Sequence, residues 1–260
     1  MSEAEALTIF NCSIPKKSDY SPTPMTALSH YLKGETLVIG YSDSQAAALA
    51  QECGLQSITC LTPWDGHLDQ QRGTHPRVSG DICRETPFDA SSFDTVIMSS
   101  ILVRLPHPAR AFQEIYRILK SGGYFFSTFG PIWSGPNGHS LYLNPGSRML
   151  DFTLNGLPSH FHLLFSEEEI AEFFLINGPL HSDRPDLHID KVLDFIYRSD
   201  MVNRFFFDDY ELLYKTYFRP VFKKYFSSHL PTKLLAILTD KYPSRQHFEV
   251  ESAEFLVHKE

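Results

Sequence analysis

The chain has 260 residues, of which 42% are hydrophobic and 21% are charged. This is enough apolar material for one sizeable core with room for an added cap. Lys and Arg total 23 against 31 Asp and Glu, a formal net charge of -8. That acidic balance argues against general nucleic-acid binding, which needs a basic face. No apolar run of about 18 residues occurs, and the start, MSEAEALTIFNCS, carries acids where a signal peptide carries positive charge. We therefore expect a soluble, cytoplasmic protein with no membrane and no nucleic-acid partner.

The cysteines indicate neither a metal site nor a redox site. Cys12, Cys53, Cys60 and Cys83 include no CxxC pair, the spacing that zinc sites and redox dithiols require. Three of them lie in or beside apolar runs, as small buried side chains do in a reducing compartment. We expect Cys53, Cys60 and Cys83 to be structural, and no metal.

Strand-like and helix-like segments alternate through the first half of the chain. The short apolar run at 35–40 is followed by a turn at 41–44 and an Ala-rich helix at 45–54. The later segments continue the alternation: strands at 55–61, 76–82, 93–100 and 124–130, and an amphipathic helix at 108–123 that ends with two glycines. This order predicts right-handed crossovers and a mainly parallel sheet covered on both faces, a doubly wound α/β fold.

The pattern changes after residue 130. A loop rich in Gly, Pro and aromatic residues spans 130–146. The remaining elements are expected to be helices at 166–177, 189–200, 208–226 (interrupted by Pro220) and 230–243, then an antiparallel strand or strand pair in 248–259. We predict a single structural domain. Within it, residues 1–130 form the α/β half with an N-terminal lead-in, 131–230 a substrate loop and helical cap, and 231–260 the closing helix and last strand or strands of the sheet.

The predicted topology places a ligand site at one edge of the sheet. Ligands of open parallel sheets bind beyond the carboxyl ends of the strands, near the switch point between the first and fourth strands. The loops that meet there are 41–44, Asp81-Ile82 and 99–105. A helix begins after the first of these loops, and its free N–H groups can receive an anion such as a carboxylate.

Residues 80–129 carry a resemblance to a known family. The stretch GDICRETPFDASSFDTVIMSSILVRLPHPARAFQEIYRILKSGGYFFSTF resembles the class I S-adenosylmethionine-dependent methyltransferases of the type 11 kind. Their pattern is an acidic residue, an LPF-like turn, FD before an apolar strand, a helix ending in LKPGG (LKSGG here), and a further strand. With the preceding elements, the resemblance covers about residues 30–130. It implies a Rossmann-like, seven-stranded sheet, with the helical cap as an insertion, and S-adenosyl-L-methionine as cofactor.

The resemblance also implies which residues bind the cofactor. Asp81 and Ile82 are expected against the adenine, and Ser99 and Ser100 along the methionine side. The loop after the first strand is expected to wrap the amino-acid end of the cofactor. Its candidate residues are Gly40, Tyr41, Ser42 and Asp43.

The first loop departs from the family's E/D-x-G-x-G-x-G pattern. Aligned with VIGYSDS, the pattern keeps Gly40 but has Val38 in place of the acid, and Ser42 and Ser44 in place of glycines. Serine lacks the freedom of glycine at positive φ. An alternative is therefore a catalytically inactive, methyltransferase-like protein that acts as a scaffold or partner subunit.

The acid that the family places after the second strand is also missing. Leu61 and Thr62 end that strand. Asp65 or Asp43 can substitute, since either could reach the ribose or the ammonium group.

His139 is the candidate catalytic base. Methyl transfer is an in-line displacement, so an enzyme mainly positions the nucleophile and, for a hydroxyl, removes its proton. The imidazole has an ordinary pKa of about 6.5, which suits neutral pH. Trp133 and Tyr142 could form walls of the pocket or contact the sulfonium by cation–π interaction. The alternative for His139, between Gly138 and Ser140, is a surface hydrogen-bonding residue.

His160 and His162 would share one face of an extended segment, and we interpret them as substrate contacts. A metal site with Glu167–Glu169 is the alternative, but capping of a helix explains those acids without a metal. Arg204 could bind an anionic group, or instead form a salt bridge with a neighbouring aspartate. The substrate-binding candidates are Trp133, Asn137, Tyr142, His160, His162 and Arg204.

The predicted function is methyl transfer from S-adenosyl-L-methionine to oxygen or nitrogen of a small-molecule metabolite or natural product. The inactive scaffold is the alternative, and a protein substrate is a third reading. A homodimer or a complex with a partner subunit fits either function.

Overall fold

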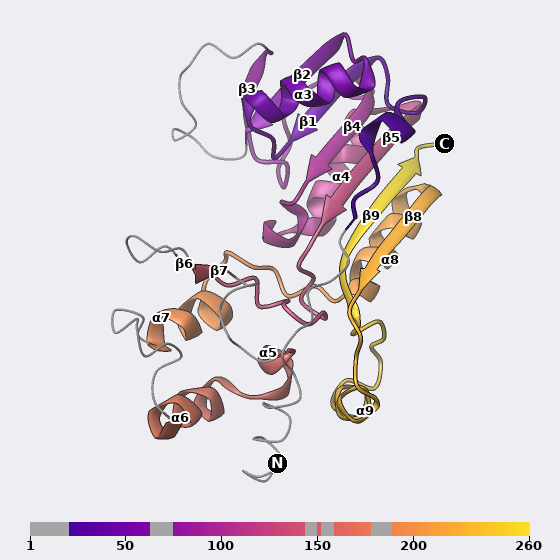
Figure 1. Cartoon of the computed structure of the whole chain (residues 1–260). Helices are drawn as coiled ribbons and strands as arrows, with labels where there is room; N and C mark the ends of the chain where they lie inside the picture. The colour runs from indigo at the N-terminus through magenta and orange to yellow at the C-terminus, as the bar shows by residue number, and fades with distance from the viewer. Residues whose placement is uncertain (1–20, 63–74, 144–149, 152–158, 178–188) are drawn as a thin grey trace. The chain divides into compact units, whose positions relative to one another are not determined.

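The computed structural model describes residues 21–62, 75–143, 150–151, 159–177 and 189–260 (Figure 1). The described chain forms two compact units. The sheet unit holds residues 20–129, 210–225 and 253–260, and the helical unit holds residues 130–209 and 226–252. Asp65 lies outside the described residues.

A seven-stranded sheet has the order β3-β2-β1-β4-β5-β9-β8 (Figure 1). β1 pairs in parallel with β2 and β4, β4 pairs in parallel with β5, and β9 runs antiparallel to β5. The strands are β1 Glu35–Ile39, β2 Ser57–Thr62, β3 Arg77–Ser79, β4 Phe93–Ser99, β5 Leu119–Phe129, β8 Arg219–Ser227 and β9 Val250–His258. The order reverses between β1 and β4, so the predicted doubly wound, mainly parallel sheet with a switch point there is confirmed.

Helices cover both faces of this sheet. Adjacent residues of β5 point to opposite faces, and Phe126 packs in a cluster with Ala46 of α3. On the other face, the Phe125 ring lies 5.9 Å from the ring of Phe112 on α4. The Phe112 ring in turn lies 4.7 Å from the ring of Tyr214 on α8. The helices concerned are α2 Met25–Leu28, α3 Asp43–Cys53, α4 Pro108–Ile118 and α8 Phe207–Tyr217, with a 3-10 turn η1 at Leu102–Arg104. The central strands β1 and β4 are consequently buried almost throughout, as parallel strands are.

The helix predicted over 108–123 is shorter than expected. α4 ends at Ile118, and Leu119 already pairs with Phe93 as the first residue of β5. The glycines after it serve the strand: Gly122 has a φ of +79°, and a Cβ on Gly123 would lie 2.9 Å from the carbonyl oxygen of Asp94. They allow an irregular strand to pass close to β4 rather than marking the helix end.

The helix predicted over 208–226 is wrong in its second half. α8 ends at Tyr217 and the edge strand β8 begins at Arg219. Pro220 explains the change, because proline disfavours a helical conformation at the residue before it and lacks an N–H. Proline is tolerated at the edge of a sheet, where its missing donor need not be paired.

The helical unit has its own core. It includes Trp133, Phe161, Ile196, Leu238 and Phe248. Its elements are the antiparallel pair β6 Tyr142–Leu143 and β7 Leu150–Asp151, α5 Phe161–Leu164, α6 Glu167–Asn177, α7 Ile189–Leu193, the π-helix η2 Asp194–Arg198, and α9 Thr232–Lys241.

The predicted start of α6 is confirmed in detail. The Glu169 N–H donates to Ser166 Oγ, and the Ser166 N–H donates to the Glu169 carboxylate. This reciprocal pair is a capping box, and it accounts for Glu169 without a metal ion. In the described residues no three His, Cys, Asp or Glu side chains group closely enough to hold a metal ion. Every helix in the same ranges is too short or too polar to cross a bilayer.

Candidate functional site

Gly40 brings the loops after β1 and β4 into contact at the switch point. It follows β1 with a φ of +83°. A Cβ there would lie 2.6 Å from the carbonyl oxygen of Ser99 and 2.7 Å from Cγ2 of Ile101. Only glycine combines this φ with so close an approach. The first loop therefore lies directly beside Ser99.

The first loop ends in a capped helix. Ser42 Oγ accepts a hydrogen bond from the Gln45 N–H at 3.4 Å, and Gln45 Oε1 accepts one from the Ser42 N–H at 2.8 Å. Ser42 has a φ of -73° and a ψ of 166°, a conformation open to any residue. Serine in place of glycine at this position therefore causes no backbone strain. Asp43 is the first residue of α3, and Tyr41 is half-buried.

Ser99 and Ser100 end β4 at the same edge of the sheet. Their hydroxyl oxygens lie 3.3 Å apart. Ser100 is exposed and has a φ of +59°, while its N–H still donates to the carbonyl of Thr128 at 2.8 Å. The backbone turns sharply here, and two hydroxyl groups are presented beside the Gly40 loop.

The loop after β3 places Asp81 and Ile82 differently. Asp81 Oδ1 accepts the Cys83 N–H at 2.9 Å, and its side chain is 41% exposed. An exposed ion pair with Arg84 adds little stability. Ile82, in contrast, is fully buried. The carboxylate is thus available to a ligand, whereas Ile82 is part of the core.

In the helical unit, Arg204 and Trp133 are in contact. The Arg204 guanidinium lies 5.7 Å from the ring centroid of Trp133, which is buried. Arg204 also donates to the carbonyls of Ile196, at 3.2 Å, and Tyr197 in the π-helix. The alternative, a salt bridge to Asp208 or Asp209, is not found among the described residues: Asp209 pairs with Arg245 at 2.5 Å, and Asp208 accepts the Gln246 N–H at 3.0 Å.

Asn137 and Tyr142 differ in exposure. Asn137 is buried and donates from Nδ2 to the carboxylate of Glu251 at 2.8 Å. That carboxylate also accepts the Ser228 hydroxyl at 3.1 Å. Tyr142, in β6, is 47% exposed. Tyr142 can reach an external molecule as it stands, whereas Asn137 already supports the fold of its loop.

His139, His160 and His162 are all buried in the helical unit. The His139 ring lies 5.7 Å from that of His162 and 5.1 Å from Phe161. Burial lowers the pKa of His139 to about 3. Burial also lowers the pKa of His160 to about 4, although a hydrogen bond with the Phe248 carbonyl opposes the shift. Burial, then the nearby His139, holds the pKa of His162 well below its ordinary range. All three imidazoles are neutral at pH 7.

The hydrogen bonds assign the tautomers of these rings. His139 Nδ1 accepts the Leu141 N–H at 3.1 Å, so its hydrogen is on Nε2. His162 Nε2 donates to the Trp133 carbonyl at 2.7 Å, so its Nδ1 is unprotonated. Within the described residues, His139 Nε2 and His162 Nδ1 have no hydrogen-bond partner. Two neighbouring rings thus carry one unused donor and one unused acceptor.

Sequence reasoning missed two contributors to these loops. Gln45, which caps α3 with Ser42, was detectable as the third residue of a capping box. Glu114 reads as an exposed helical position in PARAFQEIYRI, yet it is 6% exposed and bonds to the loop after β3. No local pattern identifies it, because its partner Thr86 lies 28 residues away in sequence.

The sheet order and the site at its switch point define the class: a Rossmann-like methyltransferase fold. The chain resembles an S-adenosylmethionine-dependent methyltransferase from Mesorhizobium loti at 13% identity and a TM-score of 0.51, over 91% of this chain and 96% of that one. It resembles a SAM-dependent methyltransferase from Methanosarcina mazei at 17% identity and a TM-score of 0.50, over 92% and 99%. No curated protein sequence matches it. Residues 37–127 match the family model of the methyltransferase domain. The match to the methyltransferase domain over residues 37–127 confirms the resemblance drawn from the sequence.

Proposed function

We propose that this protein transfers a methyl group from S-adenosyl-L-methionine to oxygen or nitrogen of a small-molecule metabolite or natural product. The observation that carries the proposal is the approach of Gly40 to the Ser99 carbonyl, within the stretch that matches the methyltransferase domain. The missing Cβ keeps backbone and hydroxyl groups of two loops close to one ligand position. Such a cradle fits a small polar cofactor.

In this proposal the sheet unit binds the cofactor. Gly40, Tyr41, Ser42 and Asp43 contact its amino-acid end, and the hydroxyls of Ser99 and Ser100 line the methionine. Asp81 accepts hydrogen bonds at the adenine end, with Ile82 supporting it from the core. Asp43 or Asp65 binds the ribose hydroxyls or the ammonium group.

The substrate contacts in this proposal are Trp133, Asn137, Tyr142, His160, His162 and Arg204. When bound, S-adenosyl-L-methionine supplies a methyl group on a sulfonium, and displacement by the acceptor's lone pair returns the carbon–sulfur electrons to sulfur. His139 takes, on Nδ1, the proton that the acceptor loses, once that nitrogen releases the Leu141 N–H. Its pKa of about 3 keeps the ring neutral at pH 7 and also makes it a weak base, so positioning of the acceptor contributes more to this proposal than proton transfer does.

A specific observation favours a second function, that of an inactive scaffold or partner subunit. The capping box between Ser42 and Gln45 already gives partners to two backbone N–H groups at the start of α3. Those groups are then less available to a carboxylate. In this second function the switch point is retained for folding, and the protein acts through its surface as a homodimer or with a partner.

Calorimetric titration with S-adenosylmethionine and S-adenosylhomocysteine separates the two functions. We expect micromolar binding by the native chain. Asp81→Ala should weaken it by about 10-fold or more, because a charged hydrogen bond contributes about 1.5–3 kcal/mol. Asp89→Ala is the control, since Asp89 is an exposed acid of the same segment. Lack of binding at millimolar ligand would overturn the enzyme function and favour the scaffold.

A further inference from the structure

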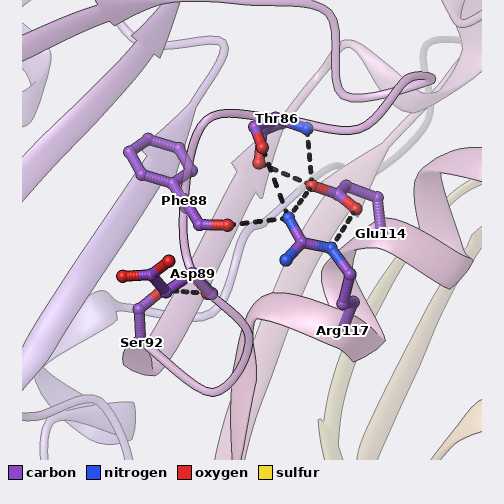
Figure 2. A network of polar contacts seen from close by, with 6 residues as sticks. All are labelled: Thr86, Phe88, Asp89, Ser92, Glu114 and Arg117. Carbon is purple, nitrogen blue, oxygen red and sulfur yellow. Dashed lines mark hydrogen bonds and ion pairs between the residues drawn. The ribbon is translucent and has the colours of Figure 1, made fainter.

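The loop that carries Asp81 is fastened to α4 by a buried carboxylate. Glu114 is only 6% exposed. Its Oε1 accepts the Thr86 N–H at 2.8 Å and the Thr86 hydroxyl at 2.5 Å. Figure 2 shows both bonds converging on this one oxygen. The backbone and the side chain of Thr86 are therefore both held at one point on the helix.

Arg117, one turn further along α4, completes the attachment. It donates from Nε to Glu114 Oε2 at 2.8 Å and from Nη2 to Glu114 Oε1 at 2.7 Å. The same Nη2 donates to the Phe88 carbonyl at 2.8 Å (Figure 2). We call Thr86, Glu114 and Arg117 the loop clip. It fixes the loop backbone at two residues, Thr86 and Phe88.

The clip is an ionic arrangement rather than an apolar one. Burial alone would raise the pKa of Glu114, but hydrogen bonds from Arg117 and Thr86 outweigh it and hold the pKa below its ordinary value. A buried ion pair loses hydration and is often no more stabilising than apolar packing. Its directional bonds, however, define where the loop backbone lies.

The clip lies a short distance along the chain from the proposed adenine contact. The Arg84 N–H donates to the Asp81 carbonyl at 2.9 Å, which closes a turn, and the Asp81 carboxylate accepts the Cys83 N–H. Ile82 and Cys83, the central residues of this turn, are buried. In the chain, Glu85 alone separates this turn from Thr86.

We propose that Glu114 is a positioning residue for the cofactor. Through Thr86 and Arg117 it holds segment 81–88 closed, the conformation in which Asp81, supported by the buried Ile82, binds S-adenosylmethionine. This inference rests on the proposed function. If Glu114 positions the loop for the cofactor, then cofactor binding and closure of the loop are coupled. A role in packing alone would not couple them.

The rate at which the Cys83 thiol is alkylated measures opening of the loop independently of catalysis. It is 2% exposed, and burial raises the pKa of its thiol to about 11, so the closed loop protects it from alkylation. Opening of the loop exposes it. Cys53, which is half-buried on α3, provides an internal reference.

The experiment follows alkylation of Cys83 and Cys53 by iodoacetamide with peptide mass mapping. If the cofactor product binds only the closed loop, S-adenosylhomocysteine at ten times its Kd should slow Cys83 alkylation by about 11-fold. Cys53 should react at an unchanged rate. Glu114→Gln and the isosteric Thr86→Val should each speed Cys83 alkylation and raise the Kd for S-adenosylhomocysteine, by about 10-fold for Glu114→Gln. Thr86→Ser, which keeps the hydroxyl, should restore both values.

Glu211→Gln is the matched control. Glu211, on α8, is also a partly buried glutamate with several donors, Lys215, Lys223 and Tyr225, and none of these donors belongs to the clip. We expect it to leave Cys83 alkylation and ligand affinity unchanged. The inference is overturned if Glu114→Gln and Thr86→Val speed Cys83 alkylation while the Kd for S-adenosylhomocysteine and the protection of Cys83 by this ligand stay unchanged. That result would make the clip purely structural. Unchanged alkylation in the variants overturns the clip itself. Absence of binding by the native chain instead overturns the proposed function, and the cofactor role of Glu114 with it.

Discussion

A Cβ on Gly40 would lie 2.6 Å from the carbonyl oxygen of Ser99. Both residues follow strands at the switch point, and neither backbone can retreat easily, since β1 and β4 are paired along their length. The φ of +83° at Gly40 adds a second restriction. Both the positive φ and the close approach to Ser99 therefore require glycine at this position. Gly40 is also the only glycine of the family's loop pattern that this chain retains.

Replacement of Gly40 by alanine should accordingly be costly. We expect Gly40→Ala to lower the free energy of unfolding by about 2–4 kcal/mol, because backbone strain and a clash with a backbone oxygen add together. Binding of S-adenosylhomocysteine should be lost as well. The matched control is Gly54→Ala: Gly54 has a φ of +68° but open space around it, so only strain of about 1–2 kcal/mol applies. Urea unfolding measures both, and equal losses would contradict the steric argument.

The buried histidines predict that stability falls with acid. The folded-state pKa values of His139 and His160, about 3 and about 4, lie below the ordinary value of about 6.5 in the unfolded chain. Between these limits the unfolded state binds more protons, so stability rises with pH and is lost as the pH falls below about 6.5. Each neutral imidazole contributes about 1.4 kcal/mol per pH unit across that interval.

Variants isolate this effect. Between about pH 4.5 and 6.5, where carboxylates of the unfolded chain are mostly ionised, His139→Phe should reduce proton uptake on unfolding by about one. His160→Phe should do the same, and the double variant should remove about two. Denaturant unfolding at several pH values measures the slope. A slope that does not change in either variant would show that these imidazoles are charged when folded.

The elements that sequence could predict are those whose signals are local. The strands β1 and β4 are apolar runs bounded by turn residues, and α6 begins with a capping box, so both kinds of element were expected. The β8 strand was not, because its aromatic residues and lysines also fit a helix face. Only pairing at the sheet edge, together with Pro220, decides for the strand.

The site was predictable to the extent that topology determines it. The switch point brings Gly40 and Ser99 together because parallel strands end at one edge. The burial of His139 was not predictable, since its flanking Gly138 and Ser140 suggested an exposed loop. The loop instead folds inward, with Ser134, Asn137 and Ser140 all buried beside it. The contacts that bury it come from residues distant in sequence, such as Phe161.

Arg204 predicts a stability effect separate from any substrate effect. Its bonds to the carbonyls of Ile196 and Tyr197 require the planar guanidinium, which at the same time lies near the ring of Trp133. Arg204→Lys keeps the charge but cannot maintain all three contacts. We expect it to lower the free energy of unfolding by about 1 kcal/mol. If the side chain also binds an anionic substrate, the KM should rise with kcat unchanged; an unaltered KM would confine Arg204 to the fold.

His139 gives the sharpest test of the proposed chemistry. With a hydroxyl acceptor, His139→Gln should lower kcat by about 10²–10⁴-fold and leave the Kd for S-adenosylhomocysteine unchanged, since His139 lies outside the proposed cofactor loops. Because burial lowers the pKa of His139 to about 3, the activity of the native enzyme should not decline near pH 6.5 through protonation of this base. A pH–rate profile of kcat and single-turnover rates of the variant measure both points. His160→Gln provides the comparison, as His160 is equally buried but has a partner on each ring nitrogen. Equal loss of stability in the two variants with kcat intact would exclude His139 as the base and leave it a packing residue of the helical unit.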